Sequence, residues 1–321
     1  MNQPSGSSAG VSLDHDDTEK VQYVVRYVTQ HRQIAPEFLS AEQYKFFTGI
    51  SPAVFKYICS AFGEKAKLDL EDLEHNDQIL LFLMKLRIDN QFDDLAVRFD
   101  VSDETAVKVF EFWLNIASEF FSDTVSWLPN EKIMSTMPDS FKLQYPNTTC
   151  IISTTEISIE QPKKLKGKNS SVKFLVAISP SGRYMFVSPA YEGQATDKYI
   201  VNTSGFLKRL KPGMEVMAHG GCYTTVAAEI SAAGATLNVP ADATGKRLSL
   251  GDIVKSREDV AVRVHVERAL ARLKKFRILN NEFPPNDVKT VEKIIVFCAG
   301  LCNLQPPLGK KKAAIKKCPK K

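Results

Sequence analysis

Six side chains of the types that bind metals or move protons stand out after residue 150 of the sequence. They are Glu156, Asp197, His219, Cys222, His265 and Glu267. Zinc accepts histidine, cysteine and carboxylate ligands, so His219-x-x-Cys222 and His265-x-Glu267 supply suitable types. On a helix, however, two positions apart means roughly 200° around the axis, so His265 and Glu267 cannot face one ion. The sequence therefore does not favour a zinc site.

A second group of candidate residues is basic and could contact phosphate. Four lie in the segment 161–171, namely Lys163, Lys164, Lys166 and Lys168. Five lie at the end of a predicted long helix, namely Arg268, Arg272, Lys274, Lys275 and Arg277. A nucleic-acid backbone attracts such clusters, but ordinary solvated turns and helix faces are also rich in charge. If these residues contact phosphate, they bind DNA. Otherwise they are ordinary charged residues of the solvent-exposed surface.

The charge of the chain is divided by position. Residues 1–149 contain 13 Lys and Arg against 23 Asp and Glu, whereas residues 150–308 contain 22 against 14. The first segment has a net charge of −10 and repels phosphate, while the second has +8 and attracts it. The tail 309–321 adds seven lysines, which form either a solubilising end or, as we expect, a nuclear localisation signal.

Composition limits the class of protein. No run of 18 apolar residues and no apolar stretch near the start appear, so we expect neither a membrane span nor a secretory signal. The six cysteines form no CxxC pair and predict free thiols. Residues 1–20 are polar and acidic, which predicts a disordered tail.

Helical patterns fill residues 21–125. Ser40, with Gln43 three positions later, forms a capping-box pattern, and Ser51-Pro52 places proline at the first position of the next helix. Apolar residues then recur at helical spacing over 77–88.

A helix over 94–99, a break at 100–101 and a second helix capped by Ser102 form a helix-turn-helix pattern. The corner of a plain helical bundle produces the same pattern. The second helix begins with Asp103 and Glu104, where a helix that reads DNA bases carries Arg, Lys, Asn or Gln. Only Thr105 and Lys108 remain as side chains that could contact bases in a DNA groove. We therefore expect the shape of a DNA-binding unit with weak or absent DNA affinity.

From residue 150 onward, strands alternate with helices. Strands are predicted at 150–159, 172–179, 183–188, 214–218 and 235–239, and helices at 197–210, 223–233 and 258–276. This order suits a mixed five-stranded sheet with helices on both faces, as in ribonuclease H-like folds. The predicted class is α+β, with a helix-turn-helix domain over 21–125, a ribonuclease H-like domain over 126–308 and a basic tail over 309–321.

Nine short motifs in register between residues 38 and 308 resemble those of PIF/Harbinger-type DDE transposases, degenerate in this copy. They lie at 84–87, 95–99, 151–156, 178–182, 196–198, 216–221, 263–268, 276–279 and 301–303. In such enzymes, three carboxylates hold two divalent metals about 3.5–4 Å apart. The resemblance places these carboxylates at Ser153, His219 and Glu267, so only Glu267 remains as a catalytic or metal-binding remnant.

The loss of two carboxylates predicts the loss of metal binding. Serine is a neutral, weak ligand, and histidine favours softer metals than Mg²⁺. Glu156 is an odd number of positions from Ser153, so strand alternation points it to the opposite face, and Asp197 is expected to cap a helix. Glu267 is three residues after Val264 on the apolar stripe of its helix, so we expect it to face the sheet.

These observations favour a transposase-derived nuclear protein that is catalytically inactive, has no cofactor and acts through protein partners or DNA. In the resembled family the transposase often works with a separate Myb-like DNA-binding protein, which the acidic half could dock. One alternative is an active nuclease using Mg²⁺ or Mn²⁺ at a site built from Glu267, His219 and Asp197. Others are a non-catalytic DNA-binding module and a decayed transposon copy without a role.

Overall fold

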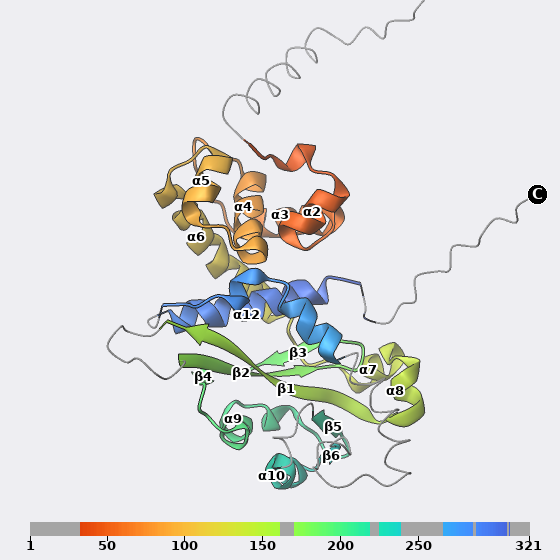
Figure 1. Cartoon of the computed structure of the whole chain (residues 1–321). Coiled ribbons are helices and arrows are strands. Elements are labelled where there is room, and N and C mark those ends of the chain that lie inside the picture. The colour runs from red at the N-terminus through yellow and green to blue at the C-terminus, as the bar shows by residue number, and fades with distance from the viewer. Residues whose placement is uncertain are drawn as a thin grey trace, which may run out of the picture.

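The computed structural model describes residues 33–160, 170–218, 225–238, 266–284, 287–306 and 308 of the chain. A group of helices forms one end of the molecule, and a mixed sheet with helices on both faces forms the other (Figure 1). The predicted α+β class with a ribonuclease H-like domain is confirmed. Among these residues, no helix is both long and apolar enough to cross a bilayer.

The N-terminal helical region follows its capping residues closely. Its elements are η1 (Pro36–Phe38), α2 (Ala41–Thr48), α3 (Pro52–Gly63), α4 (His75–Ile88), α5 (Phe92–Phe99) and α6 (Asp103–Ser122). The predicted capping box is present, because the Ser40 side chain accepts from Gln43 N and the Gln43 side chain accepts from Ser40 N. Ser51 likewise caps α3, with Pro52 at its first position.

Helix α4 lies at the centre of this region. The apolar spacing predicts a stripe, but α4 is buried on almost every side from Asp77 to Leu86. Its polar residues therefore need internal partners, and Gln78 has several. Its amide nitrogen donates to the carbonyl oxygens of Leu68 and Leu73, and its Oε1 accepts from Trp113 Nε1 at 3.0 Å. These bonds fix α4 against α6 and against the connection that precedes α4.

The sheet contains the five predicted strands and a short sixth. They are β1 (Thr148–Ile159), β2 (Ser170–Ile178), β3 (Tyr184–Val187), β4 (Tyr191–Glu192), β5 (Glu215–Ala218) and β6 (Thr236–Asn238). The order is β3-β2-β1-β5-β6, with β4 beside β2. Strands β1 and β2 pair antiparallel, while β5 is parallel to both β1 and β6. Strand β4 was not predicted because its two residues are too short to show a pattern.

The remaining helices differ more from prediction. They are α7 (Asn130–Thr136), α8 (Asp139–Gln144), α9 (Asp197–Thr203), η2 (Leu207–Arg209), α10 (Ala227–Ala232), a helix over 266–273, η5 (Arg277–Asn280) and α12 (Val288–Asn303). The helix predicted over 197–210 is two elements, because Gly205 takes a left-handed φ of +82° between them. Residues 223, 224 and 258–265 of the other predicted helices lie outside the described residues.

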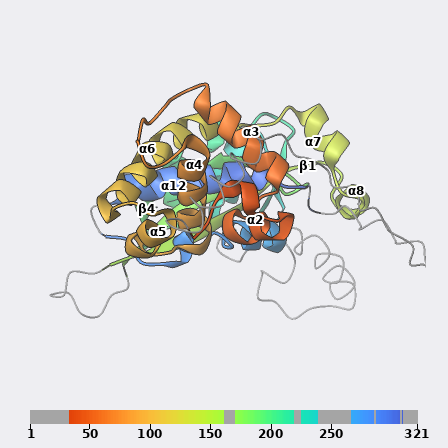
Figure 2. The ribbon, with the colours of Figure 1, turned by 90° about the horizontal axis from the view of Figure 1, so that it is seen from above.

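Two cores cover the two faces of the sheet. On one face, which we call the α9 face, Cys150, Ile152 and their neighbours pack with α9 and α10. On the other, the α12 face, Ile151 and Ile157 pack with α12 and the helix over 266–273. This second core continues without interruption into α4 and α6, so the helical region and the sheet share it. The view from above shows α12 running beneath α4 and α6 (Figure 2).

Helix α12 was missed by the sequence analysis, although it lies in the middle of the molecule. Most of its residues from Val291 to Cys302 are buried, on several sides of the helix. Val291, Ile295 and Cys298 recur at helical spacing, so the sequence carried a helical signal here that was overlooked. The burial of α12 explains why the cysteines Cys298 and Cys302 are inside the protein. These two, together with Cys59 and Cys150, are free thiols as predicted, while Cys222 and Cys318 lie outside the described residues.

Candidate functional site

The helix-turn-helix forms as predicted. Helix α5 ends at Phe99, and Asp100 after it turns the chain with a φ of +54°. The Ser102 hydroxyl then accepts a hydrogen bond from Thr105 N at 3.1 Å and begins α6. The first turn of α6 exposes Asp103 and Glu104, and Lys108 follows one turn later. The geometry is that of a DNA-reading unit, but the exposed end of its second helix is acidic.

Ser153 lies in the middle of the sheet, on the α12 face of β1. Its neighbours on that face, Ile151 and Ile157, are buried in the core shared with the helical region. Ser153 itself is only 4% exposed. Its hydroxyl has one weak hydrogen bond, donated to the carbonyl oxygen of Thr154 at 3.4 Å. The position therefore presents a buried neutral group.

The register of the sheet connects Ser153 with the end of β5. In the parallel pairing of β1 and β5, Ile152 stands opposite Ala218. Ser153 and His219 are the next residues of the two segments. His219 itself lies outside the described residues, as does Cys222. The order of the strands still confirms that β5, whose end precedes position 219, is the direct neighbour of the strand carrying position 153.

Glu267 does not face the sheet. The buried side of the helix over 266–273 consists of Val266, Ala269 and Leu273, each at most 2% exposed. Glu267 is exposed beside this stripe. The prediction that Glu267 faces the sheet is therefore wrong. It depended on an apolar stripe through Val260 and Val264, which lie outside the described residues. One residue along a helix turns the side chain by about 100°, enough to move it from the core to solvent.

The other carboxylates that could have replaced the missing ligands lie on the α9 face. Glu156 points to that face, as predicted, and pairs with Lys173 at 3.4 Å. Asp197 is buried and lies 4.0 Å from the same ammonium group. It does not cap α9, which was the expectation. The cap is Thr196, whose side chain accepts from Tyr199 N. Asp197 therefore belongs to an ion cluster across the sheet from Ser153.

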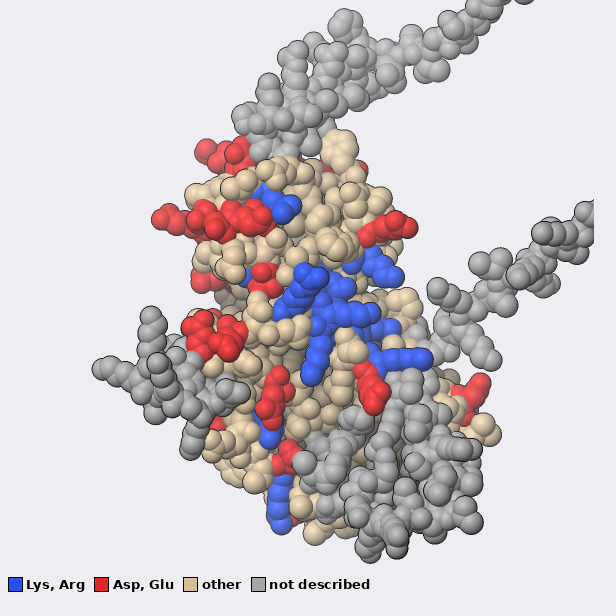
Figure 3. Space-filling model, in the orientation of Figure 1, with Lys and Arg blue, Asp and Glu red and all other residues tan. Residues whose placement is uncertain are grey.

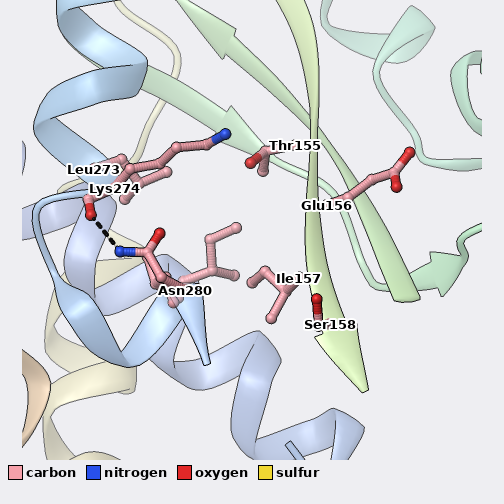
Figure 4. Close-up of a pocket in the computed structure, with 9 residues that line it drawn as sticks. Thr155, Glu156, Ile157, Ser158, Leu273, Lys274 and Asn280 are labelled. Atoms are coloured by element: carbon pink, nitrogen blue, oxygen red, sulfur yellow. Dashed lines mark hydrogen bonds between the residues drawn. The ribbon is translucent and has the colours of Figure 1, made fainter. Parts of the chain in front are cut away.

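A cavity opens next to Ser153 on the same face of β1. Its volume is about 210 Å³, and it is lined by Thr155, Ile157, Leu273, Lys274 and Asn280 among others. Figure 4 shows the Lys274 ammonium extending towards Thr155, while Glu156 points away on the far side of the strand. The Asn280 amide donates to the Lys274 carbonyl at 2.9 Å and fixes this turn. The polar groups that enter the cavity are thus a hydroxyl, an amide and a cation.

The sequence of these segments matches two known families. Residues 152–303 match the profile of the DDE superfamily endonuclease, and residues 71–119 match the helix-turn-helix of DDE superfamily endonuclease. These segments are similar to a DDE-type transposase domain with its helix-turn-helix. The first match begins at Ile152, within β1, and ends at Asn303, at the end of α12, so it covers most of the sheet and its covering helices. The second match covers α4, α5 and most of α6. No curated protein matches the chain.

The described residues of the DDE domain do not fit a pair of divalent metals. Among them, no three histidine, cysteine or acidic side chains lie close enough together to hold an ion. Mg²⁺ requires hard oxygen ligands, and the buried hydroxyl of Ser153 carries no charge. Lys274 adds a positive charge on the same face of the strand, which opposes the binding of a cation.

A basic surface lies where the DDE domain meets the helical region. Figure 3 shows Lys and Arg gathered in the middle of one face and acidic residues over the helices above it. Of the predicted phosphate contacts, Arg268, Lys274 and Lys275 are exposed, and so is Arg277. None of these four forms an ion pair with another described residue.

The other predicted phosphate contacts behave differently. Arg272 is half-buried and donates to the Pro306 carbonyl at 3.0 Å. Lys163, Lys164, Lys166 and Lys168 lie outside the described residues. The sequence analysis gave no role to Arg87, whose guanidinium packs over the Phe276 ring at 5.6 Å beside this surface. Arg87 is on α4, 189 positions from Phe276, so no local pattern identifies it.

Proposed function

We propose that this chain is a transposase-derived nuclear protein that binds DNA and protein partners without cleaving DNA. The observation that carries the proposal is the buried, neutral Ser153 at the centre of the DDE sheet. The reaction in two-metal enzymes needs anionic ligands that hold both cations against the attacking and leaving oxygens. An exposed Glu267 alone, turned away from the core, supplies too little charge for that purpose.

The proposed DNA contact is the basic surface formed by Arg268, Lys274, Lys275 and Arg277. These cations are exposed, and they have no carboxylate partner among the described residues. They are therefore available to replace the counterions of a phosphate backbone. This contact reads no base sequence, because backbone phosphates are alike along the duplex.

The proposed protein partner is a basic, DNA-reading protein, such as the Myb-like proteins that the resemblance implies. The acidic end of α6, with Asp103 and Glu104, would repel DNA but would attract a positively charged protein. The partner would supply the sequence recognition that α6 lacks. The lysine-rich tail 309–321 would direct the chain to the nucleus, where both proteins meet their DNA.

A strand-cleavage assay tests the absence of catalysis. The full chain is incubated with transposon-end DNA and Mn²⁺ beside the double variant Ser153→Asp, His219→Asp, with Ser153→Asn, His219→Asn as the matched neutral control. We expect no cleavage by the natural chain or the control. Cleavage by the double Asp variant would show that only the ligands have been lost. Cleavage by the natural chain would refute the proposal.

Since Asp at a buried position can prevent folding, calorimetry of the natural chain with Mn²⁺ provides a second measurement. We expect no stoichiometric binding at micromolar metal.

The DNA contact is tested by the salt dependence of binding, whose log–log slope changes by about 0.9 for each phosphate that is no longer neutralised. Lys274→Gln, Lys275→Gln should reduce the slope, whereas Lys208→Gln on η2 should not. Equal slopes in all three proteins would argue against this surface.

A further inference from the structure

A cavity of about 320 Å³ is lined neither by Ser153 nor by any of the four cations of the exposed basic surface. Four parts of the chain form it, namely α7, the turn between β2 and β3, the helix over 266–273 and the end of α12. Three cations line it, Lys132, Arg183 and Arg272, and no acidic residue does. These cations lie 51 and 89 positions apart, so only the fold brings them together.

The cations in this cavity are held in place but not neutralised. Arg183 Nη2 donates to the Thr124 carbonyl at 3.2 Å, and Arg272 Nη1 donates to the Pro306 carbonyl at 3.0 Å. Carbonyl oxygens orient the two guanidinium groups without removing their charge. Lys132 is exposed at the rim. Within the described part of the chain, none of the three forms an ion pair.

Arg183 also has an unused donor. Its Nε is buried and has no hydrogen-bond partner in the structure. Burial lowers the pKa of Arg183, since desolvation disfavours its charged form. An anion bound in the cavity would supply the opposite charge to the Arg183 guanidinium.

We propose that this cavity binds the phosphate group of a ligand. Phosphate presents several oxygens to the forked donors of arginine, and a third cation at the rim suits its second negative charge. Ser181 adds a hydroxyl, which has one hydrogen bond of 2.9 Å to Ser179. Leu128 and Cys302 form an apolar part of the wall, which can accept the organic portion of the ligand. The volume lies at the lower end of the range of about 300–1,000 Å³ for small-molecule sites.

The phosphate could belong to a free phosphorylated molecule or to a nucleic-acid backbone, and one experiment distinguishes the two. The full chain is titrated with inorganic pyrophosphate by calorimetry and with a labelled single-stranded oligodeoxynucleotide by fluorescence anisotropy. The variants are Lys132→Gln and Arg183→Gln. Lys208→Gln, an exposed lysine on η2 outside the cavity, is the matched control.

We expect pyrophosphate to bind with one-to-one stoichiometry. Lys132→Gln should weaken this binding about five- to tenfold, and Arg183→Gln by at least as much, while Lys208→Gln should have no effect. Lys132 is exposed on α7, so its variant should fold even if Arg183→Gln does not. A parallel loss of oligonucleotide affinity would assign the site to a backbone phosphate. A loss for pyrophosphate alone would assign it to a free ligand.

The proposal is overturned if pyrophosphate does not bind with one-to-one stoichiometry, or if Lys208→Gln weakens binding as much as Lys132→Gln. It stands apart from the DNA contact proposed above, because Lys132 and Arg183 do not belong to that surface. Lys274→Gln, Lys275→Gln should leave pyrophosphate binding unchanged. The failure of one proposal would therefore be visible without the failure of the other.

Discussion

Arg87 Nη1 donates a hydrogen bond to the main-chain carbonyl of Lys275 at 2.8 Å, which joins the end of α4 to the turn before η5. The Asn281 amide adds a second link to the same end of α4 by donating to the Asp89 carboxylate. Asp89 in turn pairs with Lys85 at 2.8 Å. The last turn of α4 is thus connected by polar bonds to the DDE segment that carries the basic surface.

Replacing Arg87 should loosen this junction. In Arg87→Ala the carbonyl of Lys275 loses its charged donor and Phe276 loses the guanidinium packed on its ring. We expect the free energy of unfolding to fall by about 1.5–3 kcal/mol, as measured by urea denaturation. The control is Arg98→Ala, which removes a half-exposed pair with Asp94 one turn away on the same helix and should cost only about 0.3–0.5 kcal/mol. Equal losses in both variants would contradict the role given to Arg87.

Asn303 holds the edge strand β3 in place. Its Oδ1 accepts from Tyr184 N at 2.8 Å, and its Nδ2 donates to the carbonyls of Tyr184 at 2.9 Å and Thr124 at 3.2 Å. Asn303→Ala would remove this partner from Tyr184 N and from both carbonyls, of which that of Thr124 keeps another donor, Arg183, and it should lower the free energy of unfolding by about 2–4 kcal/mol. Urea denaturation at neutral pH measures this loss.

Asn303→Asp is the informative comparison because it keeps the shape of the side chain. At neutral pH its carboxylate would face two carbonyl oxygens, so we expect a loss at least as large as that of Asn303→Ala. At pH below about 4 a protonated carboxyl can donate again, and part of the difference between the two variants should disappear. Identical pH dependence in the two variants would show that Asn303 does not act through its amide donor.

Gly300 allows α12 to approach α6 closely. A Cβ at this position would lie 2.8 Å from the Cβ of Phe121 and closer still to its ring. Gly300→Ala should therefore destabilise the protein by about 1–3 kcal/mol, despite the better helix propensity of alanine. Thermal unfolding measures the effect. The double variant Gly300→Ala, Phe121→Leu should recover part of the loss, and an additive loss would argue against a clash at this contact.

The buried thiols predict an alkaline loss of stability. Burial raises the pKa of Cys302 from its ordinary value of 9.0 to about 12. Below pH 9 both the folded and the unfolded chain keep this proton, so the full stability is present. Above it the unfolded chain loses the proton first. The free energy of unfolding should then fall by up to about 1.4 kcal/mol per pH unit for each such thiol.

Urea denaturation at pH 8, 9 and 10 measures this slope. Cys59, whose pKa burial also raises to about 12, should contribute in the same direction. The variant Cys302→Ala should be less stable at pH 8, because it leaves a cavity, but it should lose less stability between pH 9 and 10 than the natural chain. A slope unchanged by the substitution would show that this thiol does not titrate on unfolding in that range.

Local signals in the sequence identified most of the elements correctly. Ser40 and Ser102 cap the helices that they were predicted to cap, and Pro52 begins α3 as predicted, since these signals depend only on residues within one turn. The order of strands and helices along the sequence was sufficient to predict the ribonuclease H-like fold. The placement of Glu156 on the α9 face also followed from strand alternation alone.

The residues whose environment depends on distant contacts could be placed only by the tertiary structure. The sequence by itself determined that positions 153 and 219 carry no carboxylate. Only the fold showed that Ser153 is buried, that Glu267 is turned to solvent and that α12 fills the centre. The same holds for the convergence of Lys132, Arg183 and Arg272 on one cavity. Periodicity and capping record interactions between near neighbours, whereas burial and convergence arise from segments that meet only when the chain is packed.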